Sequence, residues 1–576
     1  MENGLLLAAS VLSICASILA FIPRFHSKRT LMLIGTIAAV FLFADLALLV
    51  YYLIGGRFDF SYVYNHTNTG LPVIYKISAL WSGQEGSLLL WASVLSVMGF
   101  SVLRLKEKNA QKIFGVFASI SVCIFLMCLI SKPFLKLPSV PLDGVGLPQA
   151  LQDPWMAVHP PLVFIAYSAM GVLASLGIAT DKNNLTAEKV QKWMRISWVF
   201  LGLGIFTGSI WAYRALGWGG YWAWDPIENA ALVPWLMLCG FLHRKDRISR
   251  ARCVLPFVAA CFGTFLTRSG ILKDQSTHAY TEGNLIVTIV IGALLLTPVC
   301  WLIIAWMRGR KGRVAACKSG LQRRSKGELL PFAGILHMYA MLITLGTIAP
   351  MIAGTNTLVE YYACISIAFV LSYSILLLIR DKETLKRRNL LMMAISTAIV
   401  ICVALVTRST NIVWIILLWA CLMPLSLWLA DRFSTNNWTF YLRHIGIILL
   451  IAGVITSSGL SRESIAFAKA DSSSINIAGN DLLITDLTKK DVLIVHTLTG
   501  DIIIQCADSV EAGGYISVPF STKPFIMLFW VGGFAAILSP CMIAVMKKIK
   551  RLPPYGNKES RRDQAKQPTK MCCRTP

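Results

Sequence analysis

Two pairs of histidines offer the clearest chemistry in this sequence. His159 and His278 stand on either side of a tryptophan-rich segment at 211–236, and His243 and His444 form a second pair. Imidazole is a common metal ligand, and two imidazoles on opposite faces of a flat macrocycle are what axial ligation of haem iron requires. We therefore predict that His159 and His278 bind one haem iron. The alternative is that both are solvated loop residues.

The tryptophan-rich segment suits a flat, apolar ligand. Five tryptophans fall between positions 211 and 235, where the average of 17 in 576 residues predicts fewer than one. An aromatic belt at the membrane interface is the alternative, but a belt needs neither the Gly-Gly, Asp-Pro and Glu-Asn pairs nor small residues between rigid rings. The sequence therefore predicts a macrocycle platform with these binding residues: Trp218, Tyr221, Trp222, Trp224, Asp225, Glu228 and Asn229.

The second histidine pair predicts a haem b inside the membrane. His243 and His444 each stand at one end of a predicted apolar helix, at similar depth, and ionisable groups within a membrane are costly and usually functional. Two interfacial histidines near lipid headgroups are the alternative. His337 lies deeper and is the substitute ligand, although a helix-packing hydrogen bond is its expected role. The remaining histidines, His26, His66 and His496, receive no role.

Two arginines near the platform could bind the haem propionates, since guanidinium groups pair well with carboxylates. They are Arg214 and Arg268, and an ordinary interfacial role is the alternative for each. Glu85 is expected to favour the start of a helix through the helix dipole. No residue is assigned a catalytic role.

The composition shows what must position these residues. Hydrophobic residues make up 56% of the chain, charged residues only 14%, and the mean hydropathy is +0.64, which excludes a soluble enzyme. Windows long enough to span a bilayer, about 20 residues, predict some fifteen transmembrane helices. Their ranges are 4–22, 31–54, 85–103, 113–131, 161–179, 196–213, 230–243, 253–269, 284–306, 330–353, 358–379, 390–407, 411–430, 444–460 and 524–546.

The net charge of +25 follows from this topology and does not point to nucleic acid. Of the 54 lysines and arginines, 41 fall in alternate loops, so the positive-inside rule predicts an outside N-terminus and a cytoplasmic C-terminus. This orientation places His159, His278 and the tryptophan platform at the outer face. It places His243 and His444 at the inner ends of their helices.

One outer segment differs from the others. Residues 461–523 alternate apolar and polar side chains around Gly-Asn-Asp and Thr-Gly-Asp turns, which predicts a small β-rich domain outside the membrane. The predicted fold is thus an all-α polytopic membrane protein with a membrane domain at 1–460, the β-rich domain at 461–523, a last helix at 524–546 and a basic cytoplasmic tail at 547–576. The sequence contains no Cys-x-x-Cys, so neither thiol exchange nor covalently attached haem is expected.

Several motifs together resemble a known family. The segment WGGYWAWDPIENAALVPW from Trp218 is similar to the tryptophan-rich signature of CcmF/NrfE-type cytochrome c haem lyases. Further similarities are WSGQEGSLLLW from 81, HPPLVFIAY from 159, GTFLTRSGIL from 263 and RHIGIILLIAGV from 443. The resemblance covers most of the first 460 residues.

The resemblance implies a multi-pass protein of the cytoplasmic membrane that promotes thioether attachment of haem to the Cys-x-x-Cys-His of apocytochrome c. It implies that His159 and His278 hold the substrate haem and that His243 and His444 hold a transmembrane haem b, the expected reductant. The implied partners are a haem chaperone of the CcmE type, an apocytochrome carrier of the CcmH/NrfF type and apocytochrome c. A transporter of haem or another amphipathic solute, and a membrane scaffold without cofactor, are the alternatives.

Overall fold

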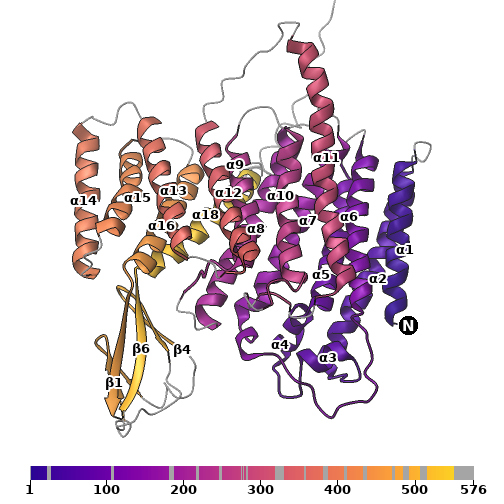
Figure 1. The fold of residues 1–576 in the computed structure, drawn as a ribbon, viewed down its shortest axis with the longest axis horizontal. Helices are drawn as coiled ribbons and strands as arrows, with labels where there is room; N and C mark the ends of the chain where they lie inside the picture. The colour runs from indigo at the N-terminus through magenta and orange to yellow at the C-terminus, as the bar shows by residue number, and fades with distance from the viewer. Residues whose placement is uncertain are drawn as a thin grey trace, which may run out of the picture.

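A computed structural model gives the architecture (Figure 1). It describes residues 2–22, 27–105, 109–180, 187–215, 220–244, 249–273, 276, 278–280, 283–317, 330–355, 359–380, 387–407, 412–431, 438–469, 474–483, 492–505 and 515–549. Helices run side by side across most of the molecule, and the β strands project from their lower end in Figure 1. We call this lower end the β end of the helix bundle.

Each of the fifteen predicted apolar ranges contains a helix, which confirms the fold class. Among the described residues eleven helices are long and apolar enough to cross a membrane, and four more apolar helices are shorter, so the count of fifteen spans is not established. A helix satisfies its backbone hydrogen bonds internally, as the bilayer requires. The helices are α1 (Glu2–Phe21), α2 (Lys28–Gly55), α5 (Gln84–Leu103), α6 (Ala110–Ser131), α7 (Pro154–Ala179), α8 (Ala187–Ala215), α9 (Pro226–Leu242), α10 (Arg250–Arg268), α11 (Leu285–Cys317), α12 (Leu330–Ala353), α13 (Val359–Arg380), α14 (Arg387–Thr407), α15 (Ile412–Asp431), α16 (Trp438–Val454) and α18 (Ile526–Ile549).

Two helices begin earlier than their hydropathy predicts, because polar caps start them. Asp153 caps α7, and its side chain accepts a hydrogen bond from the backbone N–H of Trp155. Asp225 and Glu228 form a capping box on α9. The side chain of Asp225 accepts a hydrogen bond from the backbone N–H of Glu228, and the side chain of Glu228 accepts one from the backbone N–H of Asp225. Both caps are followed by proline at the first helical position, which suits a helix start. His159 therefore lies within α7, and not before its first turn.

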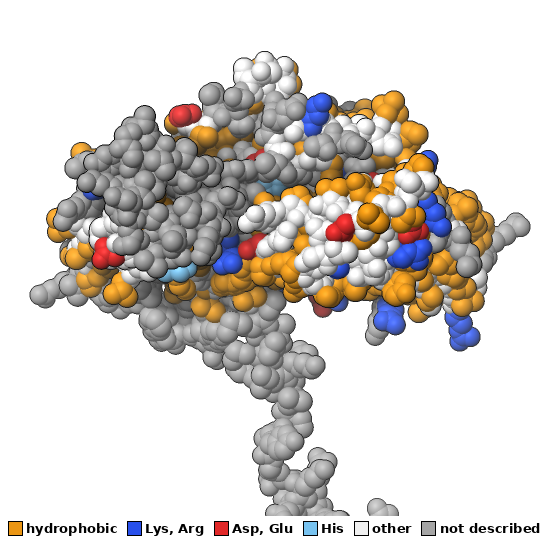
Figure 2. Space-filling view, turned by 90° about the horizontal axis from the view of Figure 1, so that it is seen from below, with side chains coloured by type: hydrophobic (Ala, Val, Ile, Leu, Met, Phe, Trp, Pro, Cys, Tyr) orange, Lys and Arg blue, Asp and Glu red, His pale blue; other side chains and the backbone are white. Residues whose placement is uncertain are grey.

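Short elements fill the connections at the β end. They include α3 (Ser61–His66), α4 (Val73–Ser78), the 3-10 turn η1 (Ala79–Trp81) and the 3-10 turn η2 (Gln149–Leu151). Figure 2 looks onto this end of the molecule: hydrophobic side chains cover much of the visible surface, and charged side chains are few and scattered.

The described part of the predicted β-rich region contains six strands. They are β1 (Arg462–Lys469), β2 (Ser474–Ile477), β3 (Asn480–Leu483), β4 (Val492–Thr497), β5 (Gly500–Gln505) and β6 (Tyr515–Pro524). One antiparallel sheet has the order β1-β6-β5-β4, and β2 pairs with β3 in a second, smaller sheet. Their apolar faces share a small core that includes Ile475, Ile477, Ile504 and Val518.

The β strands are inserted between two tightly packed helices, α16 and α18. A Cβ atom on Gly446 would lie 2.5 Å from the backbone nitrogen of Ala536, and one on Gly532 would lie 2.3 Å from that of Leu450. Only glycine allows the two backbones to approach so closely, as in many membrane helix pairs. A π-helical turn, Ile455–Gly459, ends α16 before β1 begins.

Candidate functional site

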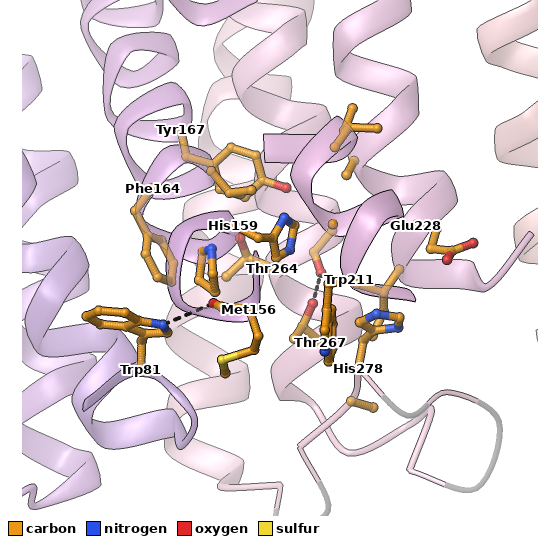
Figure 3. Close-up of a pocket in the computed structure, with 18 of the residues that line it drawn as sticks. Trp81, Met156, His159, Phe164, Tyr167, Trp211, Glu228, Thr264, Thr267 and His278 are labelled. Atoms are coloured by element: carbon orange, nitrogen blue, oxygen red, sulfur yellow. Dashed lines mark hydrogen bonds between the residues drawn. The ribbon is translucent and has the colours of Figure 1, made fainter. Parts of the chain in front are cut away.

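A cavity of about 290 Å³ lies at the β end of the helix bundle (Figure 3). Its walls come from helices α5, α7, α8, α9 and α10 and from the segment around His278, so residues far apart in the sequence meet there. The lining is largely aromatic and apolar with a few polar groups, which is typical of small-molecule sites. It includes Trp81, Met156, His159, Phe164, Tyr167, Trp211, Trp222, Glu228, Thr264, Thr267, Arg268 and His278.

His159 is oriented by the neighbouring helix. Its Nδ1 lies 2.6 Å from the carbonyl oxygen of Gly204 on α8. A carbonyl can only accept, so Nδ1 donates the proton and Nε2 keeps its lone pair. The close packing of α7 on α8 depends on Gly208, where a Cβ atom would lie 2.8 Å from the same Nδ1. The imidazole is thus fixed with a free metal-binding nitrogen.

His278 is oriented by a carboxylate. Its Nδ1 lies 3.6 Å from Oδ1 of Asp225, an ion-pair distance slightly too long for a hydrogen bond, and both side chains are largely buried. Burial disfavours the charged imidazole, but Asp225 and Glu228 outweigh it and raise the pKa of His278. Burial alone would raise the pKa of the Asp225 carboxyl. Contacts with His278 and with the backbone outweigh burial, so this pKa lies below its usual value. Asp225 therefore caps α9 and faces His278 at once.

An indole ring lies between the two histidines. The ring centroid of Trp211 is 6.4 Å from that of His159, with the planes stacked at 26°, and 5.6 Å from that of His278, with the planes at 85°. Figure 3 shows Trp211 between the two imidazoles. The indole N–H donates a hydrogen bond to the carbonyl oxygen of Ala150 at 2.7 Å. The cavity thus brings both predicted ligands together but keeps them apart by one ring.

The predicted platform residues divide between cavity wall and support. Trp222 and Glu228 line the cavity. Trp224 instead stacks on Tyr362, with centroids 4.7 Å apart. The side-chain amide of Asn229 donates to the backbone oxygen of Trp224 at 3.0 Å.

Tyr221 packs away from the cavity as well. Its ring stacks on Phe529 of α18 at 4.2 Å, and its hydroxyl lies 3.1 Å from Ser457 Oγ and 2.9 Å from Ser458 Oγ. Tyr221 thus joins the tryptophan-rich segment to the α16–α18 pair. Trp218 lies outside the described residues.

The two predicted propionate partners also differ. Arg214 lies on α8 and pairs with Asp153 through an Nε to Oδ2 contact of 3.1 Å, so it joins the end of α8 to the start of α7. Arg268 is buried in the cavity wall, where it donates to Ser87 Oγ at 2.9 Å and lies over the ring of Tyr280. Arg268 is therefore the guanidinium that faces the cavity.

The second histidine pair, His243 and His444, lies at the helix ends that are far from the β end. His243 follows the last residue of α9, and the centroids of His243 and His444 are 6.1 Å apart with planes at 88°. If both imidazoles bound one metal ion, the distance between their ring centroids would be about 6 Å. This is the sum of two metal–nitrogen bonds of about 2 Å each and of the distance from ring centre to nitrogen in both rings. His243 Nδ1 lies 2.8 Å from the carbonyl oxygen of Cys239, which again leaves Nε2 for a metal. The pair fits one bis-histidine iron.

His337 is close to this pair but points elsewhere. Its Nδ1 contacts the carbonyl oxygen of Ala333 on its own helix, and its ring packs on Phe241 at 4.4 Å. Its Nε2 is buried and has no hydrogen-bond partner among the described residues. Among the described residues, Nε2 of His337 therefore makes no helix-packing hydrogen bond.

Several cavity residues were not among the predicted site residues. Met156, Phe164 and Tyr167 follow the face of α7 that carries His159, and this helical spacing is a signal the sequence contains. Trp81 comes from the turn before α5, and its indole N–H contacts the carbonyl oxygen of Met156 at 3.4 Å. Trp211 was counted among the clustered tryptophans, but nothing in the sequence indicated that it separates the histidines.

Comparison with known proteins gives a consistent result. The model of the family "Cytochrome C assembly protein" matches residues 81–272, which include all five cavity helices but not the segment around His278. The chain is 34% identical over 379 residues to the cytochrome c-type biogenesis protein CcmF of Haemophilus influenzae, covering 60% of this chain and 57% of that protein. It is 29% identical over 510 residues to CcmF of Escherichia coli, covering 80% and 78% respectively.

A further relative is the probable cytochrome c-type biogenesis protein NrfE of Escherichia coli, at 31% identity over 58% of this chain and 63% of that protein. The match thus spans less than two thirds of the length of the Haemophilus CcmF and of this NrfE. A solved structure named "Cytochrome c Heme Lyase CcmF" has the same fold, with a TM-score of 0.70 and 21% identity over 94% of this chain and 96% of that one.

Proposed function

We propose that this chain is a cytochrome c haem lyase, because it is similar in sequence to the cytochrome c-type biogenesis proteins CcmF and NrfE. In this reaction the two cysteine thiols of an apocytochrome add across the vinyl groups of haem. Each new bond joins sulfur to carbon while the thiol proton goes to the other vinyl carbon, so no net electrons are exchanged. Haem and apocytochrome are the substrates.

The observation that carries the proposal is that each of the two cavity histidines has an acceptor group next to its Nδ1. His159 Nδ1 is hydrogen-bonded to the carbonyl oxygen of Gly204, and His278 Nδ1 faces the carboxylate of Asp225 at an ion-pair distance of 3.6 Å. Metal-bound histidines nearly always have this second partner, which fixes the tautomer and the ring. Histidines that served only packing would not need an acceptor next to Nδ1 on both sides of one cavity.

The other cavity residues then bind and orient the substrate. Trp81, Trp222 and Phe164 offer ring faces and edges to a flat apolar molecule, and Arg268 supplies a buried positive charge for a propionate. Holding a macrocycle in one orientation is the main contribution that a protein can make to a reaction between two bound partners. The protein thus acts by positioning, and we assign no acid or base.

His243 and His444 would hold a haem b, whose chemistry when bound is one-electron transfer. Their spacing of 6.1 Å fits a shared iron, and Phe332, 4.8 Å from His243, adds an apolar wall. Helix α9 has 17 residues and so separates the two sites by about 25 Å along its axis. The role we propose for haem b is reduction of the substrate haem.

The proposal includes the setting of the reaction. The chain lies in the cytoplasmic membrane with the cavity and β strands outside and the C-terminus in the cytoplasm, as the distribution of basic residues indicates. The cavity then opens toward the side on which apocytochrome, a CcmE-type haem chaperone and a CcmH/NrfF-type carrier are expected.

Absorption spectroscopy of the detergent-purified chain tests both sites. A wild-type protein without a haem b spectrum, or undiminished haem in the His243→Ala, His444→Ala double variant, would reject the internal site. For the cavity, His159→Ala should abolish maturation of c-type cytochromes in cells while the protein stays in the membrane. His496→Ala is the matched control, because this side chain is 77% exposed and lies on β4, outside the cavity lining. Equal maturation in the His159 and His496 variants would reject the cavity site.

A further inference from the structure

In the cavity described above, an indole ring lies between the two histidines that are proposed to bind one iron. The two histidine rings that bind one iron have centroids about 6 Å apart, given metal–nitrogen bonds of about 2 Å. The pair formed by His243 and His444 has this spacing, at 6.1 Å in direct ring contact. The pair formed by His159 and His278 instead has the ring of Trp211 at 6.4 and 5.6 Å from its members, between them (Figure 3).

Trp211 is held in this place by burial and by one hydrogen bond. Its indole is 7% exposed, and its N–H donates to Ala150, which belongs to the short turn η2 in front of α7. Trp211 itself lines the cavity, so a macrocycle that entered there would meet the same apolar and aromatic neighbours that now pack against the indole.

The size of the cavity points in the same direction. Its volume of about 290 Å³ lies at the lower end of the roughly 300–1,000 Å³ typical of small-molecule sites, and a porphyrin is a large ligand. Rotation of the indole would remove a bicyclic ring from the centre of the site. The same movement that brings the two imidazoles into reach of one iron would therefore also make room for the macrocycle.

We propose that Trp211 is a positioning residue that separates His159 and His278 until haem enters and then rotates away. This inference rests on the proposed function. One histidine would hold the haem iron first, and the second would reach the iron only after the indole has left its place between them.

Stopped-flow absorption spectroscopy tests the proposal. Ferric haem is mixed with the full-length protein in detergent, and the spectrum is followed for the change from high-spin five-coordinate to low-spin six-coordinate iron. Wild type should show a distinct second phase. In Trp211→Ala this phase should be at least about tenfold faster, because both the hydrogen bond to Ala150 and the ring between the histidines are removed. Trp211→Phe keeps a ring without the N–H and should fall between the two.

Trp419→Ala is the matched control. This tryptophan also donates an indole hydrogen bond, to Thr397 at 3.0 Å, but lies on α15, and it should leave both phases unchanged. Identical second phases in wild type, Trp211→Ala and Trp211→Phe would overturn the proposal. So would six-coordinate iron that forms in wild type but is absent in both Trp211 variants while their internal haem spectrum is retained.

Variants of the two ligands separate this proposal from the proposed function. In the His243→Ala, His444→Ala background, which lacks the internal ligands, His159→Ala and His278→Ala should each stop at five-coordinate iron. If both still reach the wild-type six-coordinate spectrum, the ligand assignment is wrong. If both stop there and the Trp211 variants behave as wild type, the ligands are right and the role of Trp211 is wrong.

Discussion

Replacing Asp225 by serine should weaken haem binding in the cavity without unfolding the helix that this residue starts. Asp225 has two separable tasks. It caps α9 by accepting the backbone N–H of Ile227 at 2.7 Å, and its Oδ1 lies 3.6 Å from Nδ1 of His278. Serine is among the best N-cap residues, so it keeps the first task, but it lacks the charge and the reach for the second.

The expected size of the effect follows from the geometry. The His278 and Asp225 side chains are only 17% and 6% exposed, so water cannot replace the carboxylate. Loss of such a supporting partner usually costs about 10- to 100-fold in metal affinity, or about 1.4–2.8 kcal/mol of binding free energy. Asp225→Ala should show the same loss and in addition destabilise α9 by about 1 kcal/mol through the missing cap.

Haem titration of the purified chain measures this, with His278→Ala as the second arm of a double-mutant cycle. If Asp225 acts through His278, the serine substitution should cost nothing further once the imidazole is gone. Wild-type haem affinity in Asp225→Ser would refute the reasoning. An undiminished loss in the His278→Ala background would refute it as well, because the carboxylate would then act on haem by another route.

Three further predictions concern the scaffold. Gly532→Ala should lower stability by about 1–3 kcal/mol because its Cβ would enter the backbone of α16, whereas Gly35→Ala, with nothing within 4 Å, should not; thermal unfolding in detergent compares them. Tyr213→Phe removes the 2.8 Å hydrogen bond to the buried carboxylate of Asp501, worth about 1.5–3 kcal/mol, and hydrogen exchange of β5 should rise; unchanged exchange would contradict this. Burial lowers the pKa of His66, so its neutral form stabilises the fold above the ordinary histidine pKa and this contribution is lost as pH falls toward the lowered value; exchange over α3 should rise in acid in wild type but not in His66→Phe.

Much of the fold could be predicted because the bilayer leaves few choices. Long apolar ranges must be helices in lipid, and the alternation after position 460 could only suit strands. The starts of α7 and α9 were missed because hydropathy does not register polar caps such as Asp153 and Asp225, which begin a helix before its apolar residues. Matched depth was enough to suggest that His243 and His444 meet, since both lie at helix ends.

The cavity was harder to predict because its geometry depends on rotamers and on packing between helices. Clustering of tryptophans indicated a platform, but it could not separate rings that face the cavity, such as Trp222, from rings that support it, such as Trp224 on Tyr362. The interposition of Trp211 follows from the close approach of α7 and α8 at Gly208, which no local pattern in the sequence encodes.

The insertion of the β strands between α16 and α18 makes them a replaceable module. The first and last residues of the inserted strands lie next to each other, because Arg462 of β1 is paired with Thr522 of β6. Directly opposed residues of antiparallel strands are only about 5 Å apart. A tight turn of a few residues could join these positions and leave the glycine-packed helices in register. Strands can thus be lengthened, shortened or exchanged without disturbing the register of α16 and α18, as long as β5 keeps the hydrogen bond between Asp501 and Tyr213 of α8.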